Sequence, residues 1–155
     1  MQHRLFLALG SNLGDRAAIL ASARRLISER IGALVQVSLE LETEPVGFES
    51  EHNFLNQVVE VRTLLSPQGV LDTSQVIERE LGRYRKSKGG IYRDRTCDID
   101  IILYDDLILD ADGLQIPHPR FRERTFVLSP MVELCPTCVD PVTGKTMEEL
   151  LWDVF

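Results

Sequence analysis

Short apolar runs alternate with helical patterns along the first two-thirds of the chain. Continuous or alternating apolar residues predict four strands, over residues 5–9, 34–41, 55–63 and 99–104. Apolar residues at helical spacing predict one helix from 19 to 31, and a second begins at Ser66-Pro67 and stops at Gly82. The order strand, helix, strand, strand, helix, strand predicts an α+β fold with a ferredoxin-like βαββαβ core, in which helices pack on a mainly antiparallel sheet.

The strands differ in pattern. Residues 99–104 are apolar on both faces, which predicts a central strand. Residues 34–41 alternate, with apolar Val35, Val37, Leu39 and Leu41. Residues 105–155 are expected to form an appendage with a short hairpin, a proline-punctuated loop and a final helix from Thr146 onward. With no repeat or linker in the sequence, we expect residues 1–155 to form one domain.

Composition narrows the class of protein. The 155 residues are 44% hydrophobic and 26% charged, as in a soluble globular domain. The longest apolar run, residues 5–9, is far too short for a membrane span or a signal peptide, so we expect a cytoplasmic protein that binds no membrane. Three cysteines fit a reducing compartment better than a disulfide framework. The pair Cys135 and Cys138 has no histidine at ligand spacing and gives little support to a zinc site or a redox pair.

Charge is distributed unevenly. The net charge of −7 argues against a general nucleic-acid binder. Ten of the seventeen cations nevertheless lie in residues 79–95 and 118–124, which together carry +7 (ten cations less Glu80, Asp94 and Glu123). These stretches are either two solvated faces or the binding site of a compact polyanion.

Two carboxylates begin the strand at 99–104. Asp98 and Asp100 project from one face, roughly 6–7 Å apart, while Ile99 points into the core. Such a pair suits Mg²⁺ held together with a polyphosphate; alternatively, the acids are solvated or paired with Arg93 and Arg95. Arginines on both sides of the pair favour phosphoryl-transfer chemistry.

Two further features each allow two interpretations: His118, and the pair of Phe54 with Asn56. His118, between prolines, either donates a hydrogen bond to a phosphate or caps a turn. Phe54 and Asn56 share a strand face and suit a flat heterocycle, which stacks on the ring and hydrogen-bonds to the amide. Phe54 fits an ordinary core position equally well.

Six segments together resemble the 6-hydroxymethyl-7,8-dihydropterin pyrophosphokinase family of folate biosynthesis, over residues 5–134. They are Ala-Leu-Gly-Ser-Asn-Leu-Gly-Asp at 8–15, Thr-Glu-Pro-Val-Gly at 43–47, Phe-Leu-Asn at 54–56, Arg-Thr-Cys-Asp-Ile-Asp-Ile-Ile-Leu-Tyr at 95–104, Ile-Pro-His-Pro-Arg at 116–120 and Arg-Thr-Phe-Val-Leu at 124–128. The most specific segments are residues 95–104, which contain the pattern Arg-x-x-Asp-x-Asp, and the Pro-His-Pro-Arg sequence at 117–120. The chain departs from the family at Ile91-Tyr92-Arg93-Asp94, where many members carry Arg-Trp-Gly-Pro, and at Gly113, where some place an arginine.

The resemblance implies transfer of pyrophosphate from ATP to the hydroxymethyl group of the pterin, with release of AMP. It assigns two Mg²⁺ ions to Asp98 and Asp100, and catalytic roles to these and to Arg85 and Arg95. It assigns ATP to Gln75, Glu78, Arg85, Arg95, Ile101, His118 and Arg124. It assigns the pterin to Thr43, Pro45, Val46, Gly47, Phe54, Asn56 and Phe126. ATP and the pterin are the expected partners, for a monomer or weak homodimer.

Two other classes of function fit parts of the pattern. A ferredoxin-like domain often serves as a non-catalytic small-molecule binding module, but such a module needs no paired acids behind an arginine-rich loop. A D-x-D metal-dependent nucleotide-sugar transferase would use the acids but usually needs a larger nucleotide-binding domain. Release of AMP separates the pyrophosphokinase from both.

Overall fold

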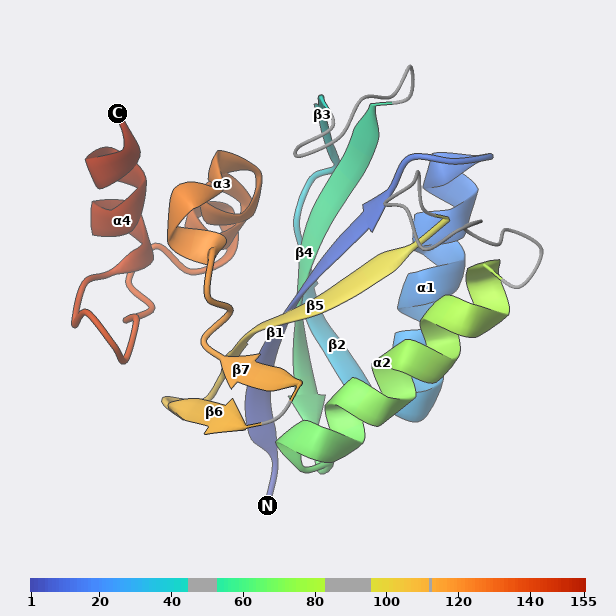
Figure 1. Ribbon diagram of the computed structural model, residues 1–155, viewed down its shortest axis with the longest axis horizontal. Helices are drawn as coiled ribbons and strands as arrows, with labels where there is room; N and C mark the ends of the chain where they lie inside the picture. Colours follow the sequence, from blue (N-terminus) through green and yellow to red (C-terminus); the bar gives the residue numbers. More distant parts are fainter. Residues whose placement is uncertain (45–52, 83–95, 112) are drawn as a thin grey trace.

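The computed structural model describes residues 1–44, 53–82, 96–111 and 113–155. Its main sheet consists of β1 (His3–Ser11), β2 (Gly32–Val37), β3 (Leu41–Thr43), β4 (Phe54–Thr63) and β5 (Asp98–Tyr104). The strand order is β2-β4-β1-β5, with β3 beside β4, and every pairing is antiparallel. Helices α1 (Arg16–Arg30) and α2 (Pro67–Gly82) connect the strands as expected, which confirms the α+β, ferredoxin-like core (Figure 1).

The sheet separates two hydrophobic cores. Leu5, Leu7 and Leu9 of β1 lie in the core that α1 and α2 cover, whereas Phe6 lies in the opposite core. The opposite core is covered by α3 (Thr125–Leu134) and α4 (Met147–Val154), which Figure 1 shows on the other side of the sheet. Alternation along one strand thus supplies both layers, because successive side chains point to opposite faces.

Polar side chains cap the starts of the helices, and α1 begins at Arg16, three residues before the predicted start at residue 19. The Asp15 carboxylate accepts a hydrogen bond from the Ala18 amide at 3.1 Å, and Ser66 Oγ accepts one from the Gly69 amide at 3.1 Å. Thr146 and Glu149 form a capping box at the start of α4, which confirms the predicted final helix. No helix in the described segments is long and apolar enough to cross a membrane.

The predicted central position of residues 99–104 is wrong. In the described part of the chain, β5 pairs with β1 alone and ends the sheet. Both faces are nevertheless buried, because Ile99 and Ile101 lie in the core beneath α2, and Ile102 and Leu103 lie in the core beside α3. An apolar pattern on both faces therefore reflected two covering layers and gave no information about strand neighbours.

The single strand predicted over residues 34–41 is divided into β2 and β3. The pairing register shifts between Leu34 and Gln36, which interrupts the alternation. Val35, Val37 and Leu39 are consequently 48%, 41% and 77% exposed. Ser38 then fixes the break, since its amide donates to the Val58 carbonyl at 2.9 Å and its hydroxyl accepts from the Val58 amide at 2.9 Å.

The appendage contains more structure than predicted. The expected hairpin is β6 (Leu109–Ala111) with β7 (Leu114–Ile116), and a 3₁₀ turn follows at Phe121–Glu123. Helix α3 was not predicted, because Pro130 lies inside it and proline usually interrupts a helix. Cys135 and Cys138 are joined by a disulfide, contrary to the expectation from the cysteine count, so that count no longer supports a reducing compartment.

Candidate active site

A pocket opens where the end of β1 meets β4, β5 and the start of α3. We call it the first pocket; its walls include Gly10, Phe54, Asn56, Asp98, Asp100 and Phe126. Gly10 lies beside both Asn56 and Phe54, because a Cβ built on it would be in ordinary van der Waals contact with Asn56 Oδ1 at 3.4 Å and Phe54 Cδ1 at 3.5 Å. The structure therefore brings the predicted aromatic, amide and carboxylate residues together.

The amide of Asn56 is held in one orientation. Its Nδ2 donates to Thr43 Oγ1 at 2.7 Å and to the Leu41 carbonyl at 3.1 Å, which joins β4 to β3. Thr43 also lines the first pocket, and Phe126 contributes from α3. Two aromatic rings beside an oriented amide and a hydroxyl suit a flat heterocycle with polar atoms on its edge.

The carboxylates of Asp98 and Asp100 both line the first pocket. They lie opposite Gly10 and Ala8 of β1 in the antiparallel register, while Ile99 between them is buried on the other face. This confirms that the two acids share one face. The Ile99 amide donates to Glu78 of α2 at 2.7 Å, and this bond holds the start of β5 against the helix.

The donor set suits magnesium better than a transition metal. In the described part of the chain, no cluster of three or more histidine, cysteine or acidic side chains is arranged to hold an ion. Mg²⁺ needs only one or two carboxylates when substrate phosphates and water complete its octahedral shell. Asp98 and Asp100 provide two hard oxygen ligands at the pocket wall.

A second pocket adjoins the first. Its walls include Leu71 of α2, Ile101 of β5, Gly113 and Gln115 of the hairpin, and His118. Asp100 lines both pockets, so a ligand in one would meet a ligand in the other at this carboxylate. Two pockets that share one carboxylate side chain suit a group-transfer enzyme, which must bring a donor and an acceptor together.

His118 is uncharged in this setting. Burial, followed by the positive charges of Arg124 and Arg120, lowers its pKa to about 4. The Arg120 amide donates to Nδ1 at 3.1 Å, so we assign the single proton of the neutral ring to Nε2. Near neutral pH the ring therefore presents one N–H donor at the second pocket.

Of the eight other predicted site residues, one lines the first pocket, two line neither pocket and five lie outside the described segments. Arg124, expected on ATP, lines the first pocket, with its guanidinium 5.7 Å from the ring centroid of Phe126. Gln75 is exposed on α2, and neither Gln75 nor Glu78 is among the residues that line the two pockets. Five predicted residues lie outside the described segments: Pro45, Val46, Gly47, Arg85 and Arg95.

Three pocket residues were not among the predicted site residues: Gly10, Leu71 and Gln115. Gly10 directly follows the strand predicted at 5–9, and Leu71 lies in the helix predicted from Ser66-Pro67, so neither position indicated a pocket. The second pocket depends on the packing of the hairpin against β5, which a sequence pattern does not show.

Comparison with known proteins agrees with this class of enzyme. The family model described as 7,8-dihydro-6-hydroxymethylpterin-pyrophosphokinase matches residues 6–136. The chain is 47% identical over 133 residues to the 2-amino-4-hydroxy-6-hydroxymethyldihydropteridine pyrophosphokinase of Porphyromonas gingivalis, covering 85% of this chain and 90% of that protein. It is 43% identical over 150 residues to the enzyme of the same name from Bacillus subtilis, covering 96% and 88%.

The fold has solved counterparts. The crystal structure of wild-type Plasmodium falciparum HPPK-DHPS superimposes with a TM-score of 0.77 at 17% identity, covering 99% of this chain and 45% of that one. This likeness concerns the fold alone. The family match and the curated relatives show that the chain belongs to the 7,8-dihydro-6-hydroxymethylpterin-pyrophosphokinase family.

Proposed function

We propose that this chain performs the reaction of its family at the two adjoining pockets. It transfers the pyrophosphoryl group of ATP to the hydroxymethyl group of 6-hydroxymethyl-7,8-dihydropterin and releases AMP. The observation that carries the proposal is that Asp100 lines both pockets, which would bring a donor and an acceptor together. Family membership favours this reaction over a binding module or a nucleotide-sugar transferase.

The pterin occupies the first pocket in this proposal. Phe54 and Phe126 contact the faces of the ring, and Asn56 with Thr43 contacts its polar edge. The Nδ2 bonds of Asn56 support this role, because they leave Oδ1 on the side of Gly10 to accept a hydrogen bond from the ring. Pro45, Val46 and Gly47 remain predicted contacts.

ATP occupies the second pocket and extends toward the carboxylate pair. Ile101 and Leu71 offer apolar surface to the nucleoside, and Nε2 of His118 donates to a phosphate oxygen. Arg124 lies on the first-pocket side and would offset charge near the transferred group. Arg85, Arg95, Gln75 and Glu78 remain predicted ATP contacts. Glu78 also accepts the hydrogen bond from the Ile99 amide, which holds the start of β5 against α2.

Asp98 and Asp100 would hold Mg²⁺, and the family resemblance implies two ions. The metal supplies charge neutralisation to the triphosphate when it is bound. The part of the protein itself is to fix the two carboxylates on one strand face beside both pockets. The monomeric or weakly dimeric state, the single domain over 1–155 and the cytoplasmic location remain predictions.

Nucleotide analysis tests the reaction. The protein is mixed with ATP, Mg²⁺ and 6-hydroxymethyl-7,8-dihydropterin, and the products are separated by ion-exchange chromatography. AMP that forms only when the pterin is present supports the proposal. ADP would show ordinary kinase chemistry, and no turnover by folded protein would favour the binding module; either result contradicts the proposal.

A further inference from the structure

Arg16, the first residue of α1, connects Glu42 and Asn53, two residues that line neither pocket. Its Nη1 donates to the Asn53 carbonyl at 2.9 Å, and its Nη2 donates to Glu42 Oε1 at 2.9 Å. Asn53 Nδ2 lies 3.4 Å from Glu42 Oε2 and closes the triangle. One guanidinium thus holds β3 and the residue that leads into β4.

These partners are the immediate neighbours of first-pocket residues. Glu42 precedes Thr43, and Asn53 precedes Phe54; Thr43 and Phe54 are paired across β3 and β4 and both line the pocket. Side chains alternate along a strand, so Glu42 points away from the pocket while Thr43 points toward it. Arg16 therefore binds the face of the β3–β4 pair that points away from the first pocket, and the opposite face of the pair forms part of the pocket wall.

The β3–β4 pair needs such support because β3 has only three residues and three pairings with β4. A strand this short gains little from its own ladder compared with the entropy lost when it is ordered. The Arg16 hydrogen bond, then the Asn53 hydrogen bond and the charge of Arg16, lower the pKa of Glu42, so its carboxylate is charged at neutral pH.

We propose that Arg16 is a positioning residue for the pterin: by binding Glu42 and Asn53 it holds Thr43 and Phe54 in the geometry that the flat ring requires. The inference rests on the proposed function, since it assigns the pterin to the first pocket. Arg16 contacts neither pocket, so its effect on catalysis passes through β3 and the entry to β4.

The same helix supplies a matched control. Arg25 is bonded to Glu29 at 3.2 Å, one turn along α1, in an exposed pair. Arg25→Gln removes the same charge from the same helix without touching β3 or β4. A general effect of charge or helix stability would therefore appear in both variants.

Steady-state kinetics with AMP as the product separates the possibilities. Arg16→Gln is expected to raise KM for the pterin about fivefold to tenfold relative to Arg25→Gln, with KM for ATP and kcat changed less than about twofold. Arg16→Lys, which keeps the charge but not the two-armed geometry, should restore part of the loss. Adding Glu42→Gln to Arg16→Gln should raise KM little further, because both act on one contact.

Three results would overturn the proposal: equal pterin KM values for Arg16→Gln and Arg25→Gln, a parallel rise in both KM values, or complete additivity with Glu42→Gln. If the wild-type protein forms no AMP, the proposed reaction fails but Arg16 can still be judged. Calorimetric titration of the protein with the pterin, in the presence of a non-hydrolysable ATP analogue, then decides. Weaker pterin binding in Arg16→Gln but not in Arg25→Gln supports the role, and equal pterin binding in the two variants rejects it.

Discussion

At the scale of single residues, the carboxylates of β5 show how much follows from local geometry. Alternation along a strand already requires Asp98 and Asp100 to share one face, and both line the first pocket. We predict that Asp100→Ala lowers turnover by about a thousandfold or more, because the charge that would face metal and phosphate is lost. Asp72→Ala, on the exposed part of α2, is the control and should retain full activity. AMP release measures both, and an active Asp100→Ala would remove this residue from the site.

A second residue-scale prediction concerns the charge of His118. Burial and the neighbouring arginines lower its pKa to about 4, so the ring should not titrate between pH 5 and 8. In NMR spectra of the free enzyme its ring C–H resonances should stay constant over that range, assigned by their loss in His118→Asn. Because the folded pKa is lower than the unfolded value near 6.5, His118 contributes stability above pH 6.5 that declines toward pH 4. A midpoint near 6.5 would contradict this placement.

The order of residue types along the chain identified several residues that line the first pocket, but not which other segments pack beside them. Phe54, Asn56 and Phe126 were recognised because aromatic and amide side chains occur at positions that resemble a known family. Arg124, which is predicted to contact ATP, lines the first pocket as the N-cap residue of α3, and its contact with ATP stays a prediction. Which pocket a side chain enters is decided by packing between segments distant in sequence.

At the scale of elements, local signals predicted helices better than strands. The caps at Ser66 and Thr146 act through bonds within one turn, so the sequence already indicated where α2 and α4 begin. The break between β2 and β3 depends instead on Ser38 bonding to Val58, twenty residues away. The edge position of β5 and the helix around Pro130 likewise depend on tertiary burial, which overrides local preference.

Gly32 gives an element-scale prediction. Glycine is required at this position by the sheet, where a Cβ would lie 2.0 Å from the Arg62 carbonyl oxygen. Gly32→Ala must push β2 away from β4 and should destabilise the fold by about 2 kcal/mol or more. Gly82→Ala is the control, since among the described residues the nearest atom to its Cβ would be Thr96 Cβ at 3.7 Å. Urea unfolding followed by circular dichroism compares them; equal stability would show that the approach is less close.

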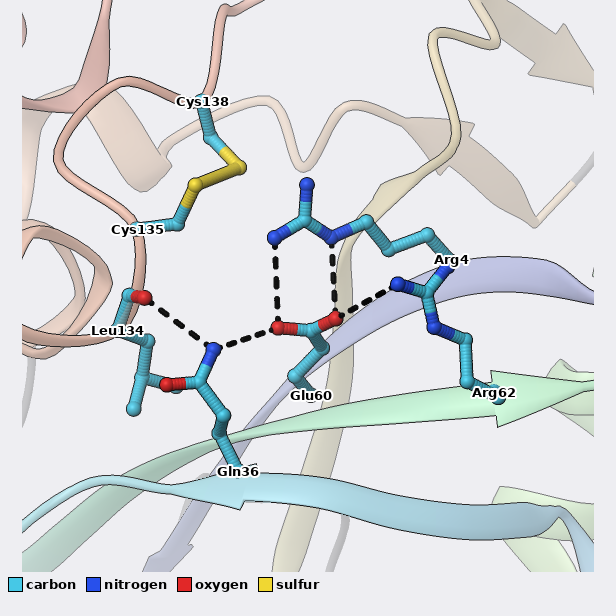
Figure 2. The surroundings of a disulfide bond; sticks show 7 residues. All are labelled: Arg4, Gln36, Glu60, Arg62, Leu134, Cys135 and Cys138. Carbon is cyan, nitrogen blue, oxygen red and sulfur yellow. Dashed lines mark hydrogen bonds and ion pairs between the residues drawn. A yellow bond between two sulfur atoms is a disulfide. The ribbon is translucent and has the colours of Figure 1, made fainter.

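At the scale of the whole molecule, a chain of polar contacts around the buried Glu60 joins the sheet to the C-terminal appendage. Glu60, 1% exposed, accepts bonds from Arg4 at 3.0 Å and Gln36 at 2.8 Å (Figure 2). Gln36 also donates to the Leu134 carbonyl at 3.2 Å, beside the disulfide at the end of α3. The sheet therefore reaches the helix that carries Arg124 and Phe126 through a chain of polar contacts as well as through the core.

Asp140 performs a similar task within the appendage. Fully buried, it accepts bonds from Arg122 Nη2 at 3.0 Å, Thr143 Oγ1 at 2.7 Å and the Val142 amide at 3.0 Å. Arg122 lies in the 3₁₀ turn before α3, so the pair holds the loop before α4 against that turn. Burial alone would raise the pKa of Asp140, but these hydrogen bonds outweigh burial and lower it.

Acid should therefore loosen the appendage through Asp140. Because its folded pKa is lower than the ordinary value of 3.8, Asp140 contributes stability that is complete above about pH 5 and is lost as the pH falls through the folded pKa. Asp140→Asn leaves Arg122 without its carboxylate and should cost about 3 kcal/mol at pH 7. The difference from wild type should shrink as the pH falls below 3.8 toward the lower folded pKa, because the unfolded carboxylate takes up its proton first. Urea unfolding at a series of pH values measures it, and a gap that stays constant would mean that the Asp140 charge contributes nothing.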